Sequence, residues 1–259
     1  MSALIDATEM YLRTLFELGE EGVVPLRARL AERLHQSVPT VSETVARLQR
    51  QDLVRLTPPD NHIALTPKGE TQAVRVMRKH RLAECLLIDV LRLPWQDVHE
   101  EACRWEHVIS DEAERRIHAL LGHPTRTPYG TEIPGLDILG LADDAAVQPL
   151  GDEARRPVTG PTAGEVTTLA ALLARPEPAA ALRVLVRQLD EPLQQETSLL
   201  SALSDAGVSP GTVVAVTPAT GGVRLTSDGG SAVLPGSALG HLLVTEVSGD
   251  PQPVAAAAR

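Results

Sequence analysis

The sequence predicts a mainly α-helical protein with small β parts, and three observations lead to this fold class. Apolar residues recur with helical spacing through about residue 121. The next segment, 122 to about 180, is rich in Pro, Gly, Ala and Thr and has little periodicity. From Ala181 to Val247, short β-like runs are separated by Gly and Pro. We therefore expect a helical N-terminal part and a C-terminal β part.

The helical part divides at recognisable start and stop signals. In the first helix, Met10, Leu12, Leu15 and Phe16 fall roughly on one stripe, and glycines close the segment. Ser37 and Ser110 are expected N-caps, Pro67 stands in the first turn of the longest helix, and Pro94 ends it. The expected helices cover residues 6–18, 26–34, 37–51, 67–91, 95–108 and 110–121.

Two short helices with a tight connection precede two short strand-like runs. These runs, residues 53–56 and 62–65, stand on either side of a turn at residues 58–61. This order of elements is typical of a helix-turn-helix followed by a two-stranded wing.

Composition sets limits on the class of protein. The 259 residues are enough for two domains or one large one, and 43% of them are hydrophobic although only 2% are aromatic. Two cysteines are too few for a disulfide framework and suit a reducing compartment. The sequence has no secretory pattern at its start and no apolar run long enough for a membrane span. We expect a soluble, cytoplasmic protein with no membrane partner.

The segment from Pro25 to Arg55 has the charge that a DNA-binding face needs. It carries six arginines and three acidic residues, a local charge of +3 in a chain whose net charge is −10. The start of its second helix, residues 37–44, is dense in small hydroxyls that allow close approach to a major groove. Neither Asn nor Arg leads that helix, so we infer that DNA sequence is read partly through shape. The alternative is that these hydroxyls only cap a helix and the arginines are only solvated. The expected DNA-contacting residues are Arg27, Ala28, Arg29, Gln36, Ser37, Pro39, Thr40, Ser42, Glu43, Arg47 and Arg50.

A second group of residues has the spacing of metal ligands. Within the predicted helices, side chains four positions apart share a face, and those three apart lie close by. The simplest division gives two sites, one with His80, Glu84 and His99, the other with Met10, Cys103, Glu106 and His107.

The donor types narrow the choice of metal. Sulfur, imidazole and carboxylate together suit Fe²⁺, Co²⁺, Ni²⁺ and Zn²⁺, and suit Mg²⁺ or Ca²⁺ poorly. A manganese site would more plausibly have carboxylates in place of Met10 and Cys103. The alternatives are that Met10 and Cys103 are core residues, that Glu84 pairs with a neighbouring Arg81 or Lys79, or that the cluster belongs to a metal-dependent hydrolase. A further rival is a DNA-binding protein gated by a small organic ligand, in which the cluster would be incidental.

Several stretches of the chain resemble the iron-dependent regulators related to the diphtheria toxin repressor. The resemblance is nearly continuous over residues 1–140 and looser over 184–247. The stretches that carry it are residues 8–14 (TEMYLRT), 25–29 (PLRAR), 77–84 (MRKHRLAE), 101–108 (EACRWEHV) and 133–137 (IPGLD).

The resemblance implies a three-part architecture. The expected parts are a winged helix-turn-helix domain over 1–73, a helical dimerisation and metal-binding domain over 74–140 and a C-terminal SH3-like β-barrel over 181–248. The composition of residues 141–180 separately predicts a flexible linker, and we expect a disordered tail over 249–259.

The resemblance also implies the ligand sets and the function. Met10, Cys103, Glu106 and His107 match the primary regulatory site, and His80, Glu84 and His99 match the ancillary site. In the family a Glu and a Gln from the SH3-like domain complete the ancillary site. Glu191 and Gln194 have the right spacing, and a competing register offers Glu196.

The implied function is repression of iron-uptake, siderophore and iron-storage genes when Fe²⁺ is plentiful. The protein would bind an AT-rich palindromic double-stranded operator as a homodimer, with two dimers on each operator. It would carry two metal sites per subunit, which also take Co²⁺, Ni²⁺, Zn²⁺ and Mn²⁺ in vitro, and no organic cofactor. It would not be an enzyme. A manganese-responsive repressor of the same family is the alternative.

The chain departs from the family pattern at two positions and in one segment, residues 141–180, which is longer and richer in Ala and Pro than the family pattern. Glu43 stands in the recognition helix where the family would have Gln, and a carboxylate there repels phosphate but can accept from cytosine N4. Cys85 stands where the family tends to have Arg, and we expect it to be an ordinary helix residue.

Overall fold

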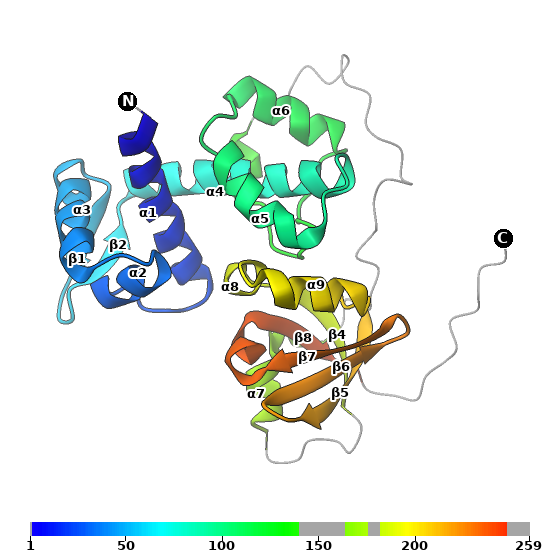
Figure 1. Cartoon of the computed structure of the whole chain (residues 1–259). Helices are drawn as coiled ribbons and strands as arrows, with labels where there is room; N and C mark the ends of the chain where they lie inside the picture. Colours follow the sequence, from blue (N-terminus) through cyan, green and yellow to red (C-terminus); the bar gives the residue numbers. More distant parts are fainter. Residues whose placement is uncertain (1, 140–163, 176–181, 248–259) are drawn as a thin grey trace. The chain divides into compact units, whose positions relative to one another are not determined.

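The computed structural model describes residues 2–139, 164–175 and 182–247. Its contacts divide the chain into two compact units, Met1–Arg156 and Pro157–Arg259, and each is described by itself. The described part of the first unit is helical with one small ribbon, and that of the second is built on an antiparallel sheet (Figure 1). This confirms the predicted fold class of a mainly helical chain with a C-terminal β part.

The first unit follows the predicted order of helices closely. Its elements are α1 (Ser2–Glu20), α2 (Arg27–Arg33), α3 (Val38–Arg50), β1 (Val54–Thr57), β2 (His62–Leu65), α4 (Pro67–Asp89), α5 (Trp95–Trp105), α6 (Asp111–Leu120) and a 3₁₀ turn, Leu136–Ile138. The predicted caps are confirmed, because Ser37 Oγ accepts from Thr40 N and Ser110 Oγ accepts from Ala113 N.

The helix-turn-helix and its ribbon share one hydrophobic core. Leu12 and Leu15 of α1 are buried in it beside Val41 and Val45 of α3, and Ile63 of the ribbon completes the packing. The strands of the ribbon pair antiparallel, from Val54↔Leu65 to Thr57↔His62. This core fixes α3 on a stable base and leaves its outer face exposed.

The start of α4 packs directly on the end of this core. Thr66 caps α4 by accepting from Gly69 N, and a Cβ built on Gly69 would lie 1.9 Å from the backbone oxygen of Leu53. No side chain fits between these two backbones, so glycine is required at this crossing. The expected boundary at residues 73 and 74 lies inside α4, which runs without a break from one predicted domain into the next.

Replacement of Gly69 by alanine is expected to destabilise the protein by about 2 kcal/mol, because the two backbones must separate to admit the methyl group. Gly19, which lies in the last turn of α1 and has nothing within 4 Å of a built Cβ, is the matched control. Urea unfolding of the two variants should show a loss of stability for Gly69→Ala and none for Gly19→Ala. Equal midpoints for both variants would contradict the close approach at Gly69.

The second unit is a six-stranded antiparallel sheet with short helices. Its strand order is β3-β8-β4-β5-β6-β7, and its buried side chains are mostly Val and Leu. Its elements are β3 (Thr167–Thr168), α7 (Leu169–Leu173), β4 (Leu182–Leu189), α8 (Glu191–Gln194), α9 (Thr197–Asp205), β5 (Val213–Ala219), β6 (Gly222–Ser227), β7 (Gly230–Pro235), a 3₁₀ helix (Gly236–His241) and β8 (Leu242–Glu246). The SH3-like description of this sheet stays a prediction.

Two expectations for this half of the chain need correction. The flexible linker predicted over 141–180 is wrong for residues 164–175, because β3 pairs with β8 and Leu169 and Leu172 of α7 are buried. The rest of that segment, and the predicted tail over 249–259, lie outside the described residues. The helices α8 and α9 were not predicted within the β-like region. Within the described residues, no helix is long and apolar enough to cross a membrane.

Candidate metal centre

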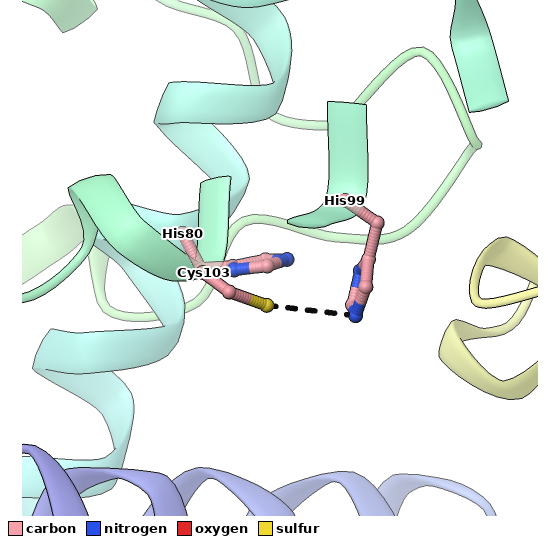
Figure 2. Close-up of side chains that lie close together, drawn as sticks. All are labelled: His80, His99 and Cys103. Atoms are coloured by element: carbon pink, nitrogen blue, oxygen red, sulfur yellow. Dashed lines mark hydrogen bonds between the residues drawn. The ribbon is translucent and has the colours of Figure 1, made fainter. Parts of the chain in front are cut away.

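Two helices bring the central candidate ligands together. His80 and Glu84 are four residues apart on α4, and His99 and Cys103 are four residues apart on α5, so each pair shares a face. Figure 2 shows the side chains of His80, His99 and Cys103 gathered at one place, and their candidate ligand atoms all lie within 4.8 Å of one another.

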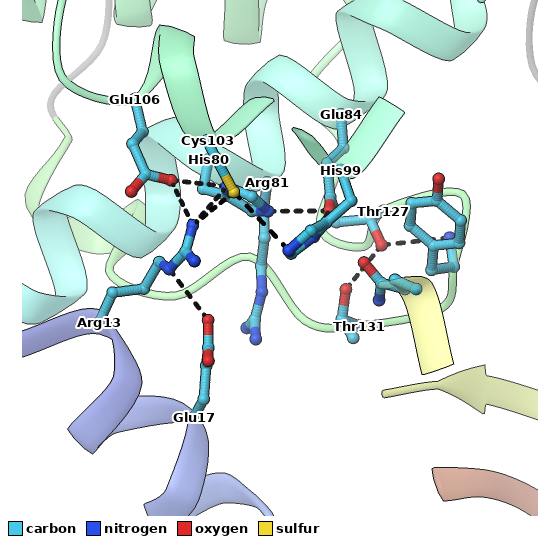
Figure 3. A network of polar contacts seen from close by, with 12 residues as sticks. Arg13, Glu17, His80, Arg81, Glu84, His99, Cys103, Glu106, Thr127 and Thr131 are labelled. Atoms are coloured by element: carbon cyan, nitrogen blue, oxygen red, sulfur yellow. Dashed lines mark hydrogen bonds and ion pairs between the residues drawn. The ribbon is translucent and has the colours of Figure 1, made fainter. Parts of the chain in front are cut away.

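His80 is the hub of the polar network in Figure 3. It is fully buried, with Nδ1 2.6 Å from Glu106 Oε2 and Nε2 3.0 Å from Glu84 Oε1. Glu84 Oε1 also lies 3.8 Å from His99 Nδ1, and His99 Nε2 lies 3.6 Å from Cys103 Sγ. Residues that the spacing assigned to two sites thus form one connected network in the structure.

Arg13 of α1 enters the same network (Figure 3). Its Nη1 donates to Glu106 Oε2 at 2.9 Å and to Cys103 Sγ at 3.0 Å, and lies 3.3 Å from His80 Nδ1. Its Nε lies 3.1 Å from Glu17 Oε1, one turn later on α1. A buried cation of the first helix is therefore bound to residues of α4 and of α5 and its C-terminal turn.

The surroundings of these groups change their pKa values in opposite directions. Burial raises the pKa of the Cys103 thiol, but Arg13, His80 and His99 outweigh burial and hold it at about 4. Burial lowers the pKa of His99, yet its contacts with Cys103 and Glu84 raise it to about 9. Burial raises the pKa of Glu84, and the charge of His80 outweighs it and lowers the pKa to about 2. Cys103 is thus a thiolate at neutral pH, the form that binds metal.

We expect the alkylation rate of Cys103 in chelator-treated protein to be nearly constant from pH 5.5 to pH 8. A pKa of about 4 keeps the thiolate fully formed over this window, whereas an ordinary thiol would react more than about a hundredfold faster at the upper end. Iodoacetamide labelling followed by mass spectrometry measures the rate. Cys85 is buried, so Cys85→Ser should not alter the result. A rate that rises tenfold with each pH unit would contradict the thiolate assignment.

His107 lies at the edge of the network, whereas the side chain of Met10 packs elsewhere. His107 Nδ1 is 2.5 Å from Glu9 Oε2 of α1, and His107 Nε2 is 3.4 Å from Glu106 Oε1. Met10 follows Glu9 on α1, and its partly buried side chain packs against the core of the helix-turn-helix. The first helix thus meets the residues that follow α5 through Glu9 as well as Arg13.

The donors present fit a borderline divalent cation. They combine a thiolate, imidazoles and carboxylates, which match Fe²⁺, Co²⁺, Ni²⁺ and Zn²⁺. Glu84 Oε2 and His99 Nδ1 are buried and, within the described residues, have no hydrogen-bond partner. A buried carboxylate oxygen such as Glu84 Oε2 needs a further positive or donating group, and a cation would supply it. His99 Nδ1 would bind a cation after losing its proton.

In the second unit, Glu191 and Gln194 lie on α8, both buried. Gln194 Nε2 donates to the backbone oxygen of Leu189, and Gln194 Oε1 is buried without a hydrogen-bond partner in the described part of the chain. Glu196, the competing residue, is exposed at the start of α9. Which of these residues completes the ancillary site stays a prediction.

The predicted DNA-contacting residues lie on α2, α3 and the turn between them. Most are exposed, including Ser37, Pro39, Thr40, Glu43 and Arg50. The others have the following places: Arg29 pairs with Glu32, Gln36 accepts from Tyr11, Ser42 donates to the backbone of Val38, and Arg27, Ala28 and Arg47 lie at or near the surface.

Arg13 and Glu9 are the residues of the network that sequence reasoning missed. Both stand within three residues of Met10 on the first helix, and this spacing was the available signal. Arg81 was also missed. It is 1% exposed, and its Nη2 lies 2.6 Å from Glu20 Oε2 at the end of α1.

Two family models match the first unit of the chain. The model described as the iron dependent repressor N-terminal DNA binding domain covers residues 3–62, and that of the iron dependent repressor metal binding and dimerisation domain covers residues 66–135. Fold and site thus define a DNA-binding regulator with a metal-binding dimerisation domain, and not an enzyme.

Full-length relatives show which family this is. The chain is 47% identical over 241 residues to the iron-dependent repressor IdeR of Mycobacterium tuberculosis, a match that covers 91% of this chain and 92% of that protein. It is 45% identical over 229 residues to the diphtheria toxin repressor of Corynebacterium diphtheriae, covering 88% and 92%. The chain belongs to the iron-dependent repressor family, as its motifs predicted, and DNA and a second copy of the chain are its partners.

Solved structures with the same fold include regulators named for manganese. A manganese-dependent transcriptional repressor in complex with manganese matches with a TM-score of 0.68 and 26% identity, covering 93% of this chain and all of that one. The IdeR of T. acidophilum matches with a TM-score of 0.63 at 24% identity, covering 92% and 97%, which shows the fold alone.

Proposed function

We propose that the protein is an iron(II)-activated transcriptional repressor. The observation that carries the proposal is the polar network in which Arg13 of α1 contacts His80 of α4, Cys103 of α5 and Glu106, which follows α5. A centre at this place touches both the helix that begins the DNA-binding part and the helices of the dimerisation part. Cation binding there can therefore control DNA binding.

Two sites per subunit account for the candidate ligands. Met10, Cys103, Glu106 and His107 form the proposed primary site, in which the thiolate and carboxylate supply negative charge to a divalent cation. The proposed ancillary site has His80, Glu84 and His99, with Glu191 and Gln194 as further donors. A bound cation supplies a fixed positive charge that ties these side chains together.

The proposed control of DNA binding works through α1. Met10 is on this helix, whereas Cys103 is on α5 and Glu106 and His107 follow directly after α5. When these four side chains act as one ligand set, α1 is fixed against the dimerisation helices. The two recognition helices of a dimer are then held one DNA turn, about 34 Å, apart.

The proposed DNA target is an AT-rich palindromic double-stranded operator bound by two dimers. In this proposal, residues 1–73 bind DNA and residues 74–140 hold the dimer and the metal. The regulated genes are those of iron uptake, siderophore synthesis and iron storage. The support is the identity of 45% to 47% with relatives named as iron-dependent or diphtheria toxin repressors.

A manganese-responsive repressor is the second candidate, because structural neighbours at about a quarter identity carry manganese in their names. The donor set favours iron, since a thiolate and a thioether suit Fe²⁺ better than Mn²⁺.

The test is fluorescence anisotropy of a labelled AT-rich palindromic duplex, under anaerobic conditions, with Fe²⁺, with Mn²⁺ and with chelator. We expect tight binding with Fe²⁺ and loss of binding with chelator. A greater potency of Mn²⁺ would assign the protein to the manganese branch. Binding that is indifferent to chelator would reject metal control.

A further inference from the structure

The guanidinium of Arg13 contacts the same atoms that a metal ion at the proposed primary site would contact. One nitrogen, Nη1, lies within 3.0 Å of both Cys103 Sγ and Glu106 Oε2. Both atoms belong to the proposed ligand set, and Arg13 is itself 8% exposed. The buried positive charge of α1 therefore neutralises the same atoms that would bind a metal ion.

We propose, on the basis of the function proposed above, that Arg13 is an internal counter-cation of the metal-free protein and that metal binding displaces it. A divalent ion binds a thiolate or carboxylate at about 2.0–2.3 Å, closer than Nη1, and uses the same lone pairs. Two positive charges a few ångströms apart in a buried site repel each other strongly. Arg13 and the metal ion therefore cannot share these ligands.

The first helix offers Arg13 an alternative partner. Arg13 Nε lies 3.1 Å from Oε1 of the Glu17 carboxylate, which is one turn along the same helix and is also buried. The guanidinium can therefore leave Cys103 and Glu106 while it keeps one carboxylate partner. Met10 stands three positions before Arg13, on the same side of α1. When the Arg13 side chain leaves these ligands and Met10 binds the metal ion in its place, α1 would shift. This shift would couple metal binding to the DNA-binding part.

The test compares full-length Arg13→Leu, Arg13→Lys and Arg78→Leu with the parent chain. Leucine removes the charge and offers no donor atom, and lysine keeps one point charge. Arg78 is the matched control, because it forms another buried ion pair, with Glu114 at 2.7 Å, and contacts none of the proposed ligands in the described part of the chain. The probe is Co²⁺ alone, titrated anaerobically and followed by its thiolate charge-transfer absorbance. A thermal melt in chelator measures each metal-free protein.

We expect Arg13→Leu to bind Co²⁺ at least about tenfold more tightly than the parent, because no internal cation must be displaced. Its metal-free form should melt at a lower temperature, since Cys103 and Glu106 lose their counter-cation. Arg13→Lys should have a Co²⁺ affinity and a melting temperature between those of the parent and of Arg13→Leu. Arg78→Leu should lower the melting temperature and leave the Co²⁺ affinity unchanged, which separates displacement from general destabilisation.

Unchanged or weaker Co²⁺ binding by both Arg13 variants would overturn the proposal and make Arg13 a structural anchor. If the parent does not bind Co²⁺ and Arg13→Leu does, the counter-cation role holds and metal control of the parent fails. If neither chain binds Co²⁺, both the counter-cation role and the proposed function are rejected.

Discussion

Replacement of Glu106 by glutamine is expected to lower metal-dependent DNA affinity by about a hundredfold, the full size of a strong coupling between two sites. Glu106 is the carboxylate that joins the most partners in the network, with Arg13 Nη1 at 2.9 Å and His80 Nδ1 at 2.6 Å. An amide is a poor ligand for a divalent cation beside a thiolate. It also removes the negative charge that Arg13 and His80 share in the metal-free protein. The measurement is operator anisotropy with saturating Fe²⁺ and with chelator.

The same substitution should also destabilise the metal-free protein, by about 3–5 kcal/mol, because it breaks a buried ion pair on one side only. The control is Glu100→Gln on α5, whose carboxylate is 81% exposed and pairs with Arg104 at the surface. That variant should keep the parent's stability and its DNA affinity within a factor of about two. If Glu106→Gln retained full metal-dependent binding, Glu106 would not be a ligand.

The elements of the first unit were predictable because short-range signals determine them. The second strand of the ribbon has the predicted bounds, His62–Leu65, and the longest helix begins at Pro67 as predicted and ends two residues earlier. Proline and the serine and threonine caps act within one turn of the chain, so the sequence carries this information locally. Helix ends without such a signal, as in α5, were predicted a few residues too late.

The contacts of the candidate metal centre were less predictable, for a geometric reason. A four-residue spacing shows which side chains share a face of one helix, but it does not show how two helices cross. The crossing of α4 and α5 places His80 against Glu106 as well as Glu84 and so links the two predicted ligand sets. Arg13 was missed for the same reason, since its partners lie 67 to 93 residues away.

In the second unit, the helices α7 and α9 were missed because their local sequence patterns were misinterpreted. The sequence from Thr197 to Asp205 was included in a β-like region, yet it forms α9 with Leu200 and Leu203 buried three residues apart. This nine-residue helix buries only this one pair of leucines. Such a short apolar pattern does not distinguish a helix from a strand by periodicity. The segment around Leu169 was likewise assigned to a linker because its neighbours are rich in Pro and Gly.

Replacement of Glu43 by glutamine is expected to change which base pairs the protein selects, by about tenfold to a hundredfold at one position of each half-site. Glu43 is exposed on α3, one turn beyond Thr40 and one turn before Arg47, in the row that a recognition helix presents to the major groove. A carboxylate there accepts from cytosine N4 and repels phosphate, whereas an amide pairs with adenine N6 and N7. The variant should thus lose a preference for cytosine and gain one for adenine.

Selection from a duplex library randomised around an AT-rich palindrome, with Fe²⁺ present, measures this change. Glu32→Gln is the matched control, because Glu32 is an exposed acid of α2 that pairs with Arg29 and lies outside the recognition helix. Loss of either charge should raise non-specific affinity slightly, since both carboxylates repel phosphate. Only Glu43→Gln should alter the selected sequence. Identical base preferences in the two variants would mean that Glu43 faces the backbone, and that DNA shape and the hydroxyls of Ser37 and Thr40 determine specificity without it.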